Sequence, residues 1–440
     1  MSGITMSVGS ARNPAGPTPV SGRIPASGAP ALRFRSVPPL SLYIHIPWCV
    51  RKCPYCDFNS HEAREPVPEQ RYIDALIADL EVALPLVWGR KVYTVFFGGG
   101  TPSVFSAEGI ERIIAAVRAR MPLAIDAEIT LEANPGTFEA EKFCAFRAAG
   151  VNRMSIGIQS FNPRHLKALG RIHDDAQARA AIEITRQNFD NFNLDLMYGL
   201  PQQSANEARA DIEIALSFAP PHLSAYQLTL EPNTYFHRYP PTLPDEDATA
   251  EMQEAVEQLL AAAGYEHYET SAFAKAEDRE SSQQQRSVPR LTPYASRLTA
   301  ACRHNLNYWM FGDYLGIGAG AHSKLSFADR IVRQMRYKQP GQYMERAAAG
   351  SAIQEQHGVA ANEIGFEFMM NALRLNSGFP SVLFEERTGM PLTAVLKELD
   401  AAERRGLITR DELRIAPTER GRRFLNDLLQ RFLPEDRVSV

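Results

Sequence analysis

Short apolar runs and longer polar–apolar segments alternate along the chain from residue 41 onward. The short runs are rich in β-branched and aromatic residues, which favours strands, and the longer segments have helical spacing of their apolar positions. The expected strands are Leu42–Ile46, Val92–Phe97, Glu128–Glu132, Arg153–Ile158, Phe192–Tyr198 and Leu223–Leu230. The expected helices lie near 69–84, 106–120, 138–149, 174–188 and 205–218.

This repetition predicts an α/β fold. A strand followed by a helix and a further strand gives parallel strands with right-handed crossovers. About six such units form either a partial TIM barrel or an open doubly wound sheet, and periodicity alone does not distinguish the two.

The flanking segments predict further divisions. Residues 1–39 are rich in Gly, Pro, Ser and Ala, contain four Arg and lack Asp and Glu, so they predict a disordered extension without a secretory signal. The α/β core is expected over 40–275, and the polar run 276–300 predicts a surface loop. Residues 301–358 connect this loop to a C-terminal unit over 359–440.

The C-terminal unit is expected to be a small winged-helix-like domain. Helical patterns cover Glu363–Leu373, Leu392–Arg405 and Glu419–Leu433, and a short hairpin is expected over Gly406–Ile415. Residues 401–437 hold nine Arg against seven Asp or Glu, a near balance that favours packing onto the core over DNA binding.

Composition narrows the class of protein only slightly. The chain is 45% hydrophobic and 22% charged, with a net charge of −4. No apolar run reaches the length of a membrane span, and the mild acidity gives no reason to expect nucleic acid as a partner.

Cys49, Cys53 and Cys56 stand together as CVRKCPYC directly after the first strand pattern. Three thiolates on one loop can hold three irons of a 4Fe–4S cube, and without a fourth neighbouring cysteine the last iron stays open to a small molecule. A structural zinc site normally needs four ligands, and a disulfide framework is unusual in a chain of this length without a secretory signal. Thiols kept as cluster ligands indicate a reducing compartment and a cytoplasmic location.

Polar residues follow the other expected strands. A GGGTP run that includes Gly99, Gly100 and Thr101 follows the second strand, and its glycines let the backbone approach a ligand. The active site of a β/α barrel forms at the carboxyl ends of its strands, so these residues are expected to converge. Singly, each is more simply a turn or a solvated loop residue. The other polar residues expected at this site are Glu132, which ends the third strand, Gln159, which follows the fourth, Asp195, which lies inside the fifth, and Arg171.

The aromatic segment 303–309 begins with a possible metal ligand, His304. A neutral imidazole can bind heme iron, but a lone histidine beside apolar residues is more often a hydrogen-bonded core residue. Cys144 is expected to pack in the core between two phenylalanines, whereas Cys302 is less easily assigned to the core.

Together these segments resemble the radical S-adenosylmethionine (SAM) family that contains oxygen-independent coproporphyrinogen III dehydrogenase and the related heme chaperones. The resemblance covers about Leu40 to Leu433, through YIHIPWCVRKCPYCDFNSH, FFGGGTPS, EITLEANPG, RMSIGIQSFN, LGRIH, NLDLMYGLPQQ, LSAYQLTLEPNT, HNLNYW and DYLGIGAGAHS. It implies a partial TIM barrel with a C-terminal helical domain. It also implies that SAM binds the open iron and contacts Tyr43, Tyr55, Gly99, Gly100, Thr101, Glu132, Gln159, Arg171 and Asp195.

Two places separate the branches of this family. The dehydrogenases carry a further cysteine soon after the third cluster ligand, where this chain has Phe58. The chaperones carry an HNxxYW heme-binding motif, which HNLNYW matches. The resemblance therefore implies heme binding through His304, Asn305, Tyr308 and Trp309.

The leading hypothesis is a chaperone that passes heme to apo-cytochromes or other hemoproteins. The alternatives are oxidative decarboxylation of coproporphyrinogen III and a DNA-binding iron–sulfur regulator, which the charge balance disfavours. The sequence assigns no catalytic residue. It also leaves open the acceptor, its location at a membrane, SAM cleavage and the oligomeric state.

Overall fold

The computed structural model describes residues 32–34, 36–137, 140–276 and 300–434. The predicted disordered extension over 1–39 and the predicted loop over 276–300 therefore lie mostly outside the described residues.

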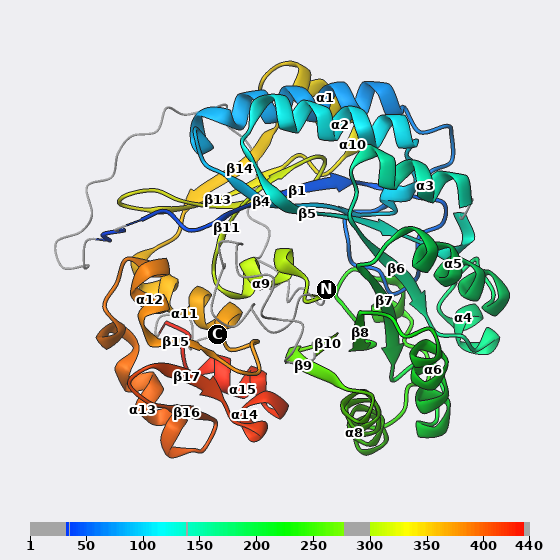
Figure 1. Ribbon diagram of the computed structural model, residues 1–440. Helices are drawn as coiled ribbons and strands as arrows, with labels where there is room; N and C mark the ends of the chain where they lie inside the picture. Colours follow the sequence, from blue (N-terminus) through cyan, green and yellow to red (C-terminus); the bar gives the residue numbers. More distant parts are fainter. Residues whose placement is uncertain (1–31, 35, 138–139, 277–299, 435–440) are drawn as a thin grey trace.

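Six parallel strands form the centre of the molecule (Figure 1). They lie side by side in chain order, as the repeated strand–helix pattern requires, and curve into an open barrel. This confirms the predicted α/β partial barrel. The strands are β1 (Leu40–Ile46), β4 (Val92–Gly99), β5 (Leu123–Ala133), β6 (Arg153–Gln159), β7 (Phe192–Tyr198) and β8 (His222–Gln227).

Helices cover the convex face of this sheet (Figure 1). Asp174 and Ser204 begin two of them with capping boxes, in which the cap side chain and the side chain three residues later satisfy backbone N–H groups reciprocally. The helices are α1 (Glu69–Ala83), α2 (Ala107–Arg120), α3 (Ala140–Ala149), α4 (Pro163–Ala168), α5 (Asp175–Asn188), α6 (Ala205–Ser217) and α8 (Glu246–Ala262).

The sheet extends beyond the six predicted strands on both sides. An antiparallel pair, β10 (Ala272–Lys275) and β9 (Tyr265–Glu269), follows β8. On the other side β11 (Asp313–Ile317) pairs in parallel with β1 and leads into antiparallel strands. These are β12 (His322–Ser326), β13 (Ile331–Arg336) and β14 (Ile353–Gly358), with α10 (Pro340–Ala348) packed against α1.

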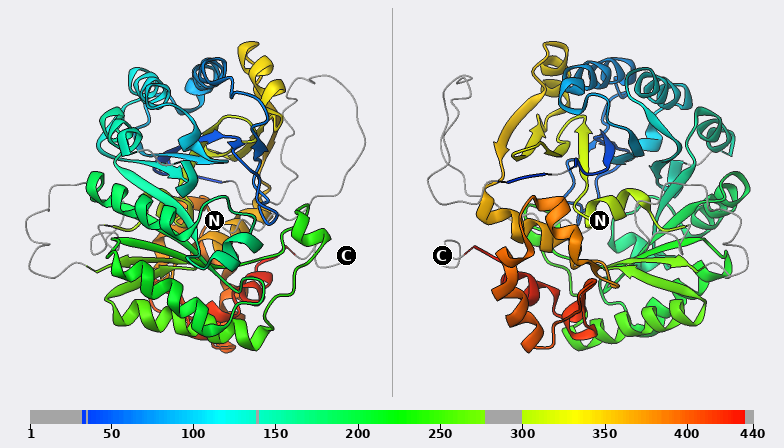
Figure 2. Two further views of the ribbon diagram at one scale, coloured as in Figure 1. Left: turned by 90° about the vertical axis from the view of Figure 1, so that its right-hand side faces the viewer. Right: turned by 60° about the vertical axis from the view of Figure 1, so that its left-hand side comes forward.

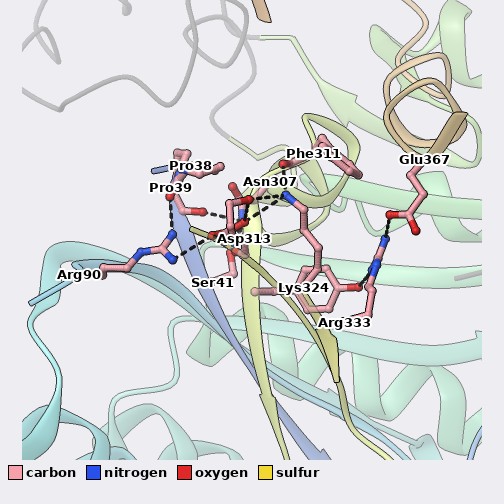
Figure 3. Close-up of polar contacts among 12 residues, drawn as sticks. Pro38, Pro39, Ser41, Arg90, Asn307, Phe311, Asp313, Lys324, Arg333 and Glu367 are labelled. Carbon is pink, nitrogen blue, oxygen red and sulfur yellow. Dashed lines mark hydrogen bonds and ion pairs between the residues drawn. The ribbon is translucent and has the colours of Figure 1, made fainter. Parts of the chain in front are cut away.

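Helix α9 (Arg303–Trp309) lies on the concave side of the sheet (Figures 1 and 2). A buried polar cluster fixes its C-terminal end (Figure 3). The Asn307 amide donates to the Ser41 hydroxyl at 2.8 Å and to the Asp313 carbonyl at 2.9 Å. The Asp313 carboxylate is paired with Lys324 at 3.0 Å and with Arg90 at 2.8 Å. The cluster therefore fastens α9 to β1, β11 and β12.

The C-terminal domain has the expected winged-helix-like order, with helices preceding a hairpin. It has its own apolar core, which also includes residues of α9 and of the β9–β10 edge. Its elements are α11 (Ala361–Ala372), β15 (Phe379–Pro380), α12 (Ser381–Thr388), α13 (Leu396–Arg404), β16 (Ile408–Arg410), β17 (Arg414–Pro417), α14 (Glu419–Arg423) and α15 (Leu425–Gln430).

None of the helices in the described ranges combines the length and the apolarity needed to cross a bilayer.

Candidate functional site

The cysteine loop leaves the sheet at the carboxyl end of β1. Cys49 ends the short strand β2 (Trp48–Cys49), which pairs with β3 (His61–Glu62) and so closes the loop at its base. A turn brings the Cys56 N–H to the Cys53 carbonyl at 3.2 Å. All three thiols are half-buried, so they face a site at the mouth of the barrel that a ligand can still reach.

The arrangement of these thiols does not suit a single metal ion. Within the described parts of the chain, no three Cys, His, Asp or Glu side chains converge on one ion position. The three cysteines of the loop do not do so either. A 4Fe–4S cube requires less convergence, because each thiolate binds a different iron. Burial raises the pKa of Cys49 to about 11. Bound iron would keep such a thiol deprotonated, as metal coordination does.

Gly99 lies where no side chain fits. Its φ is +110°, and a Cβ on it would come within 2.5 Å of the His45 ring. His45 in turn donates from Nε2 to the Asn59 carbonyl at 2.9 Å and accepts at Nδ1 from the Tyr43 hydroxyl at 3.1 Å. The glycine is therefore required by packing against His45, and this packing holds the loop close to Tyr43.

Glu132, Tyr43 and Asp195 form one part of the predicted cleft. A Cβ on Gly98 would lie 3.1 Å from the Tyr43 ring and 3.2 Å from a Glu132 carboxylate oxygen, which places both side chains against the backbone of this loop. Burial, with a further contribution from Asp195, raises the pKa of Glu132 to about 7. Asp195 accepts hydrogen bonds from Ser155 at 3.0 Å and Asn193 at 2.8 Å.

Arg171 organises the other part of the cleft. Its guanidinium donates to the Asn134 side chain at 2.6 Å and to the Gly157 carbonyl at 2.7 Å, and it lies 3.6 Å from the Cys53 sulfur. Asn134 donates to the Thr101 hydroxyl at 2.7 Å, so one chain of hydrogen bonds joins the cysteine loop, the GGGTP loop and the end of β5. Asn134 was not among the predicted site residues, although it lies two residues after the predicted strand Glu128–Glu132.

Gln159 and Tyr55 complete this set. Gln159 has a φ of +62°, which is rare outside glycine, and its buried side-chain oxygen has no hydrogen-bond partner among the described residues. Tyr55 packs against a small apolar cluster that includes Phe236. A narrow cleft beside Arg171 is lined by Val50, Arg51, Cys53, Thr101, Asn134, Gly170, Arg171 and Ile172. Of the predicted SAM contacts, Thr101 and Arg171 line it, whereas Glu132, Tyr43 and Asp195 do not.

The residues present fit a cluster with SAM at its open iron. The glycine loop lets the Tyr43 and Glu132 side chains lie against its backbone, Glu132 and Asp195 offer carboxylates, and the buried Gln159 oxygen has no hydrogen-bond partner among the described residues. These groups can accept hydrogen bonds from an ammonium group or from ribose hydroxyls.

His304 lies apart from the cysteine loop, inside the barrel. Its ring is fully buried, 4.9 Å from the ring of Phe96 and 5.2 Å from that of Tyr308. Nδ1 is hydrogen-bonded to the Thr94 hydroxyl at 2.8 Å, whereas Nε2 has no partner in the described structure. Burial lowers the pKa of His304 to about 3, with Arg153 contributing, so the ring is neutral.

The other residues of the aromatic motif lie on α9 and contact neighbouring elements. Tyr308 stacks on Tyr314 with ring centroids 4.2 Å apart, and the Arg374 guanidinium lies 5.1 Å from the Trp309 ring centre. Asn305 is half-buried. Because Arg374 follows α11, the motif contacts the C-terminal domain as well as the barrel.

The two remaining cysteines behave differently from each other. Cys144 is exposed on α3, so the prediction that it packs in the core was wrong: the neighbouring Phe143 and Phe146 point inward, and the helical period turns Cys144 to solvent. Cys302 is buried, and burial raises the pKa of its thiol to about 12.

Comparison with known proteins agrees with this architecture. Residues 43–215 match the radical SAM superfamily, and residues 359–424 match the HemN C-terminal domain. A solved structure, the radical SAM enzyme coproporphyrinogen III oxidase (HemN) from Escherichia coli, matches with a TM-score of 0.73 and 25% identity over 90% of each chain.

Curated relatives are closer in sequence. The heme chaperone HemW of Escherichia coli is 47% identical over 91% of this chain and 99% of its own length. The corresponding protein of Haemophilus influenzae is 45% identical with the same coverage of both chains. The chain therefore belongs to the radical SAM superfamily and, within it, to the family of the heme chaperone HemW.

Proposed function

We propose that this protein binds heme at the α9 motif and transfers it to acceptor apo-hemoproteins, with apo-cytochromes as the first candidates. The observation that carries the proposal is the state of His304: its ring is neutral, and Nε2 has no hydrogen-bond partner in the described structure. A neutral imidazole with a free nitrogen is the form that ligates heme iron.

Aromatic side chains around the His304 ring support the proposal. Phe96, Tyr308 and Tyr43 surround the imidazole, and flat apolar rings suit a porphyrin plane. His304 is fully buried, so heme reaches Nε2 only when the side chains that pack on this edge of the ring move aside, while Nδ1 keeps its hydrogen bond to Thr94. Helix α9 also contacts the C-terminal domain, where Trp309 lies beside Arg374.

The cluster and SAM are part of the same proposal. Cys49, Cys53 and Cys56 would hold a 4Fe–4S cluster, and Glu132 and Arg171 would be among the residues that bind SAM. Tyr43, Tyr55, Gly99, Gly100, Thr101, Gln159 and Asp195 would complete its contacts. When bound, the cluster and SAM supply one-electron chemistry, or they have a structural role if SAM is not cleaved. We place the protein in the cytoplasm, where the thiols stay reduced.

A hemin titration tests the heme role. Cluster-loaded wild type and His304→Ala are compared for Soret absorbance and for transfer to an apo-cytochrome. His165→Ala is a matched control, because that histidine is also fully buried with both ring nitrogens lacking a normal hydrogen bond, yet it lies on α4 outside the barrel. Weakened binding and transfer in His304→Ala alone supports the proposal. Equal binding and transfer in all three proteins would refute the role of His304.

Oxidative decarboxylation of coproporphyrinogen III is the second candidate. It is favoured by the structural match to an enzyme described as coproporphyrinogen III oxidase. Phe58 argues against it, because the dehydrogenase pattern has a cysteine there and Phe58 presents a 41% exposed apolar ring instead.

A further inference from the structure

The direction of the hydrogen bond between His304 and Thr94 is assigned from the second contact that the Thr94 hydroxyl makes. The Thr94 hydroxyl donates to the Ser41 hydroxyl oxygen at 2.7 Å, so its proton is already used. The Thr94 oxygen must then accept from His304 Nδ1, 2.8 Å away. The imidazole proton is thereby assigned to Nδ1, and the lone pair is assigned to Nε2.

These hydroxyls are built into the interior of the barrel. Thr94 and Ser41 lie on the adjacent strands β4 and β1, and both are fully buried. Ser41 also accepts from the Asn307 amide at 2.8 Å, one turn further along α9 from His304. The same short chain of hydrogen bonds thus fixes the ring and the helix that carries it.

The backbone of His304 is held independently. The Glu128 carboxylate accepts from the backbone N–H groups of His304 and Arg303, each at 3.1 Å. A carboxylate at the first turn of a helix satisfies N–H groups that have no partner within the helix. Glu128 therefore sets the position of α9, which leaves the orientation and tautomer of the ring to Thr94.

We propose that Thr94 is a positioning residue for heme binding, which holds His304 in the tautomer that leaves Nε2 free to ligate iron. This inference rests on the proposed heme-binding function and assigns a role to a residue outside the aromatic motif. Metal-bound histidines usually donate their other ring N–H to such a partner, and loss of that partner typically weakens metal affinity by roughly 10- to 100-fold. We expect a weakening in that range for Thr94→Val.

The tautomer can be measured without heme. Histidine labelled with ¹⁵N gives separate signals for protonated and unprotonated ring nitrogens, and the pair missing from His304→Ala identifies His304. We expect a proton on Nδ1 in the wild type and in Thr94→Ser, which keeps the hydroxyl. Thr94→Val should shift the population toward a proton on Nε2, because Nδ1 loses its acceptor.

Hemin binding is then measured on the same full-length, cluster-loaded variants. Thr94→Val should weaken binding and change the Soret and EPR signatures of the iron, and Thr94→Ser should restore both. Thr130→Val is the matched control: Thr130 is also fully buried, on the neighbouring strand β5, but its hydroxyl has no partner in the described structure. This variant should bind hemin as the wild type does.

The outcomes separate the two claims. A wild-type ring protonated on Nε2, or a Thr94→Val protein with unchanged tautomer and hemin binding, would overturn the positioning role alone. An altered tautomer in Thr94→Val, combined with hemin binding that neither Thr94→Val nor His304→Ala changes, would overturn the heme assignment of His304. The role of Thr94 in heme binding would be overturned with it.

Discussion

Tyr43 and His304 lie side by side in the barrel, with ring centroids 6.4 Å apart. Tyr43 belongs to the predicted SAM cleft, where its hydroxyl donates to His45 and its ring lies against the glycine loop. His304 belongs to the aromatic motif on α9. The two candidate sites are therefore adjacent, and the Tyr43 and His304 rings lie between them, although the two residues are about 260 positions apart in the chain.

Because the two sites are adjacent, we predict that bound SAM changes the environment of bound heme. Adding SAM to the heme-loaded protein should shift the Soret band or the EPR signal of the iron, because Tyr43 contacts both sites. Tyr43→Leu should reduce that shift while the cluster remains. Absorbance and EPR titrations measure it, with Tyr239→Leu as a control, since Tyr239 is exposed. Identical heme spectra with and without saturating SAM would show that the sites are independent.

The cluster prediction concerns four of the five cysteines. Cys49→Ala, Cys53→Ala and Cys56→Ala should each lose the oxygen-sensitive 4Fe–4S cluster, because each removes one of three thiolates on the loop. Cys144→Ala should keep the cluster, since its thiol is exposed on α3. Iron and sulfide analysis with EPR after anaerobic reconstitution decides this. An intact cluster in Cys53→Ala would contradict the assignment.

Gly99→Ala should weaken the effect of SAM on the EPR spectrum of the reduced cluster. The new Cβ would lie 2.5 Å from His45 and would push the loop out of place. Gly89→Ala is the control for backbone strain: Gly89 also has a positive φ, of +71°, but a Cβ there meets nothing within 4 Å. Gly89→Ala carries the cost of the left-handed region, roughly 1–2 kcal/mol, without a clash. Gly99→Ala combines backbone strain at a φ of +110° with the clash. Equal SAM responses in the two variants would count against a role of the glycine loop in SAM binding.

The strand–helix alternation was enough to predict the core, because the parallel strands are short and largely apolar, as in β4, and regularly spaced helical segments separate them. The later strands β11–β14 were missed. They contain buried polar residues, including Lys324 and Arg336, which disguise a strand pattern. Their burial depends on partners far away in the chain, such as Asp79 for Arg336, and no local pattern encodes that pairing.

Some residues of the candidate site were predictable from the sequence and others were not. The cysteine triplet and the glycine loop are contiguous in sequence, so their chemistry was readable from spacing. Thr94, Glu128 and Asn134 were not recognised, because each acts through a contact with a distant segment. Their residue types are ordinary for strands and loops. Only the folded barrel shows which of them touch His304 or Arg171.

Asp313 should contribute strongly to stability. It is fully buried between Lys324 and Arg90, and these cations hold its pKa below the usual range in spite of the opposing effect of burial. Asp313→Ala leaves the Lys324 ammonium buried without a countercharge, with only the Phe311 carbonyl and the Ser326 hydroxyl among the described residues to accept from it, so we expect a loss of about 3–5 kcal/mol. Asp329→Ala, in an exposed pair with Arg330, should change stability by less than about 1 kcal/mol. Urea unfolding followed by circular dichroism measures both.

The pH dependence of this contribution has a definite sign. A carboxyl whose pKa is lower in the folded state stabilises the protein above its unfolded pKa of about 3.9 and loses that contribution as the pH falls further. The stability gap between wild type and Asp313→Ala should therefore narrow as the pH falls below about 4. A gap that stays constant into strong acid would contradict the ion-pair explanation.

The last prediction separates the chaperone from the enzyme. The cluster-loaded wild type should form no protoporphyrinogen from coproporphyrinogen III under reducing, SAM-supplied conditions, because Phe58 stands where the dehydrogenase pattern has a cysteine. Phe58→Cys tests whether that single position limits the activity, and its cluster content must match that of the wild type. The hemin titration is run on the same preparation, because a protein without its cluster would fail the enzyme assay trivially. Robust decarboxylation by the wild type would favour the enzyme over the chaperone. Hemin binding without decarboxylation, lost on replacement of His304, is the result that we expect.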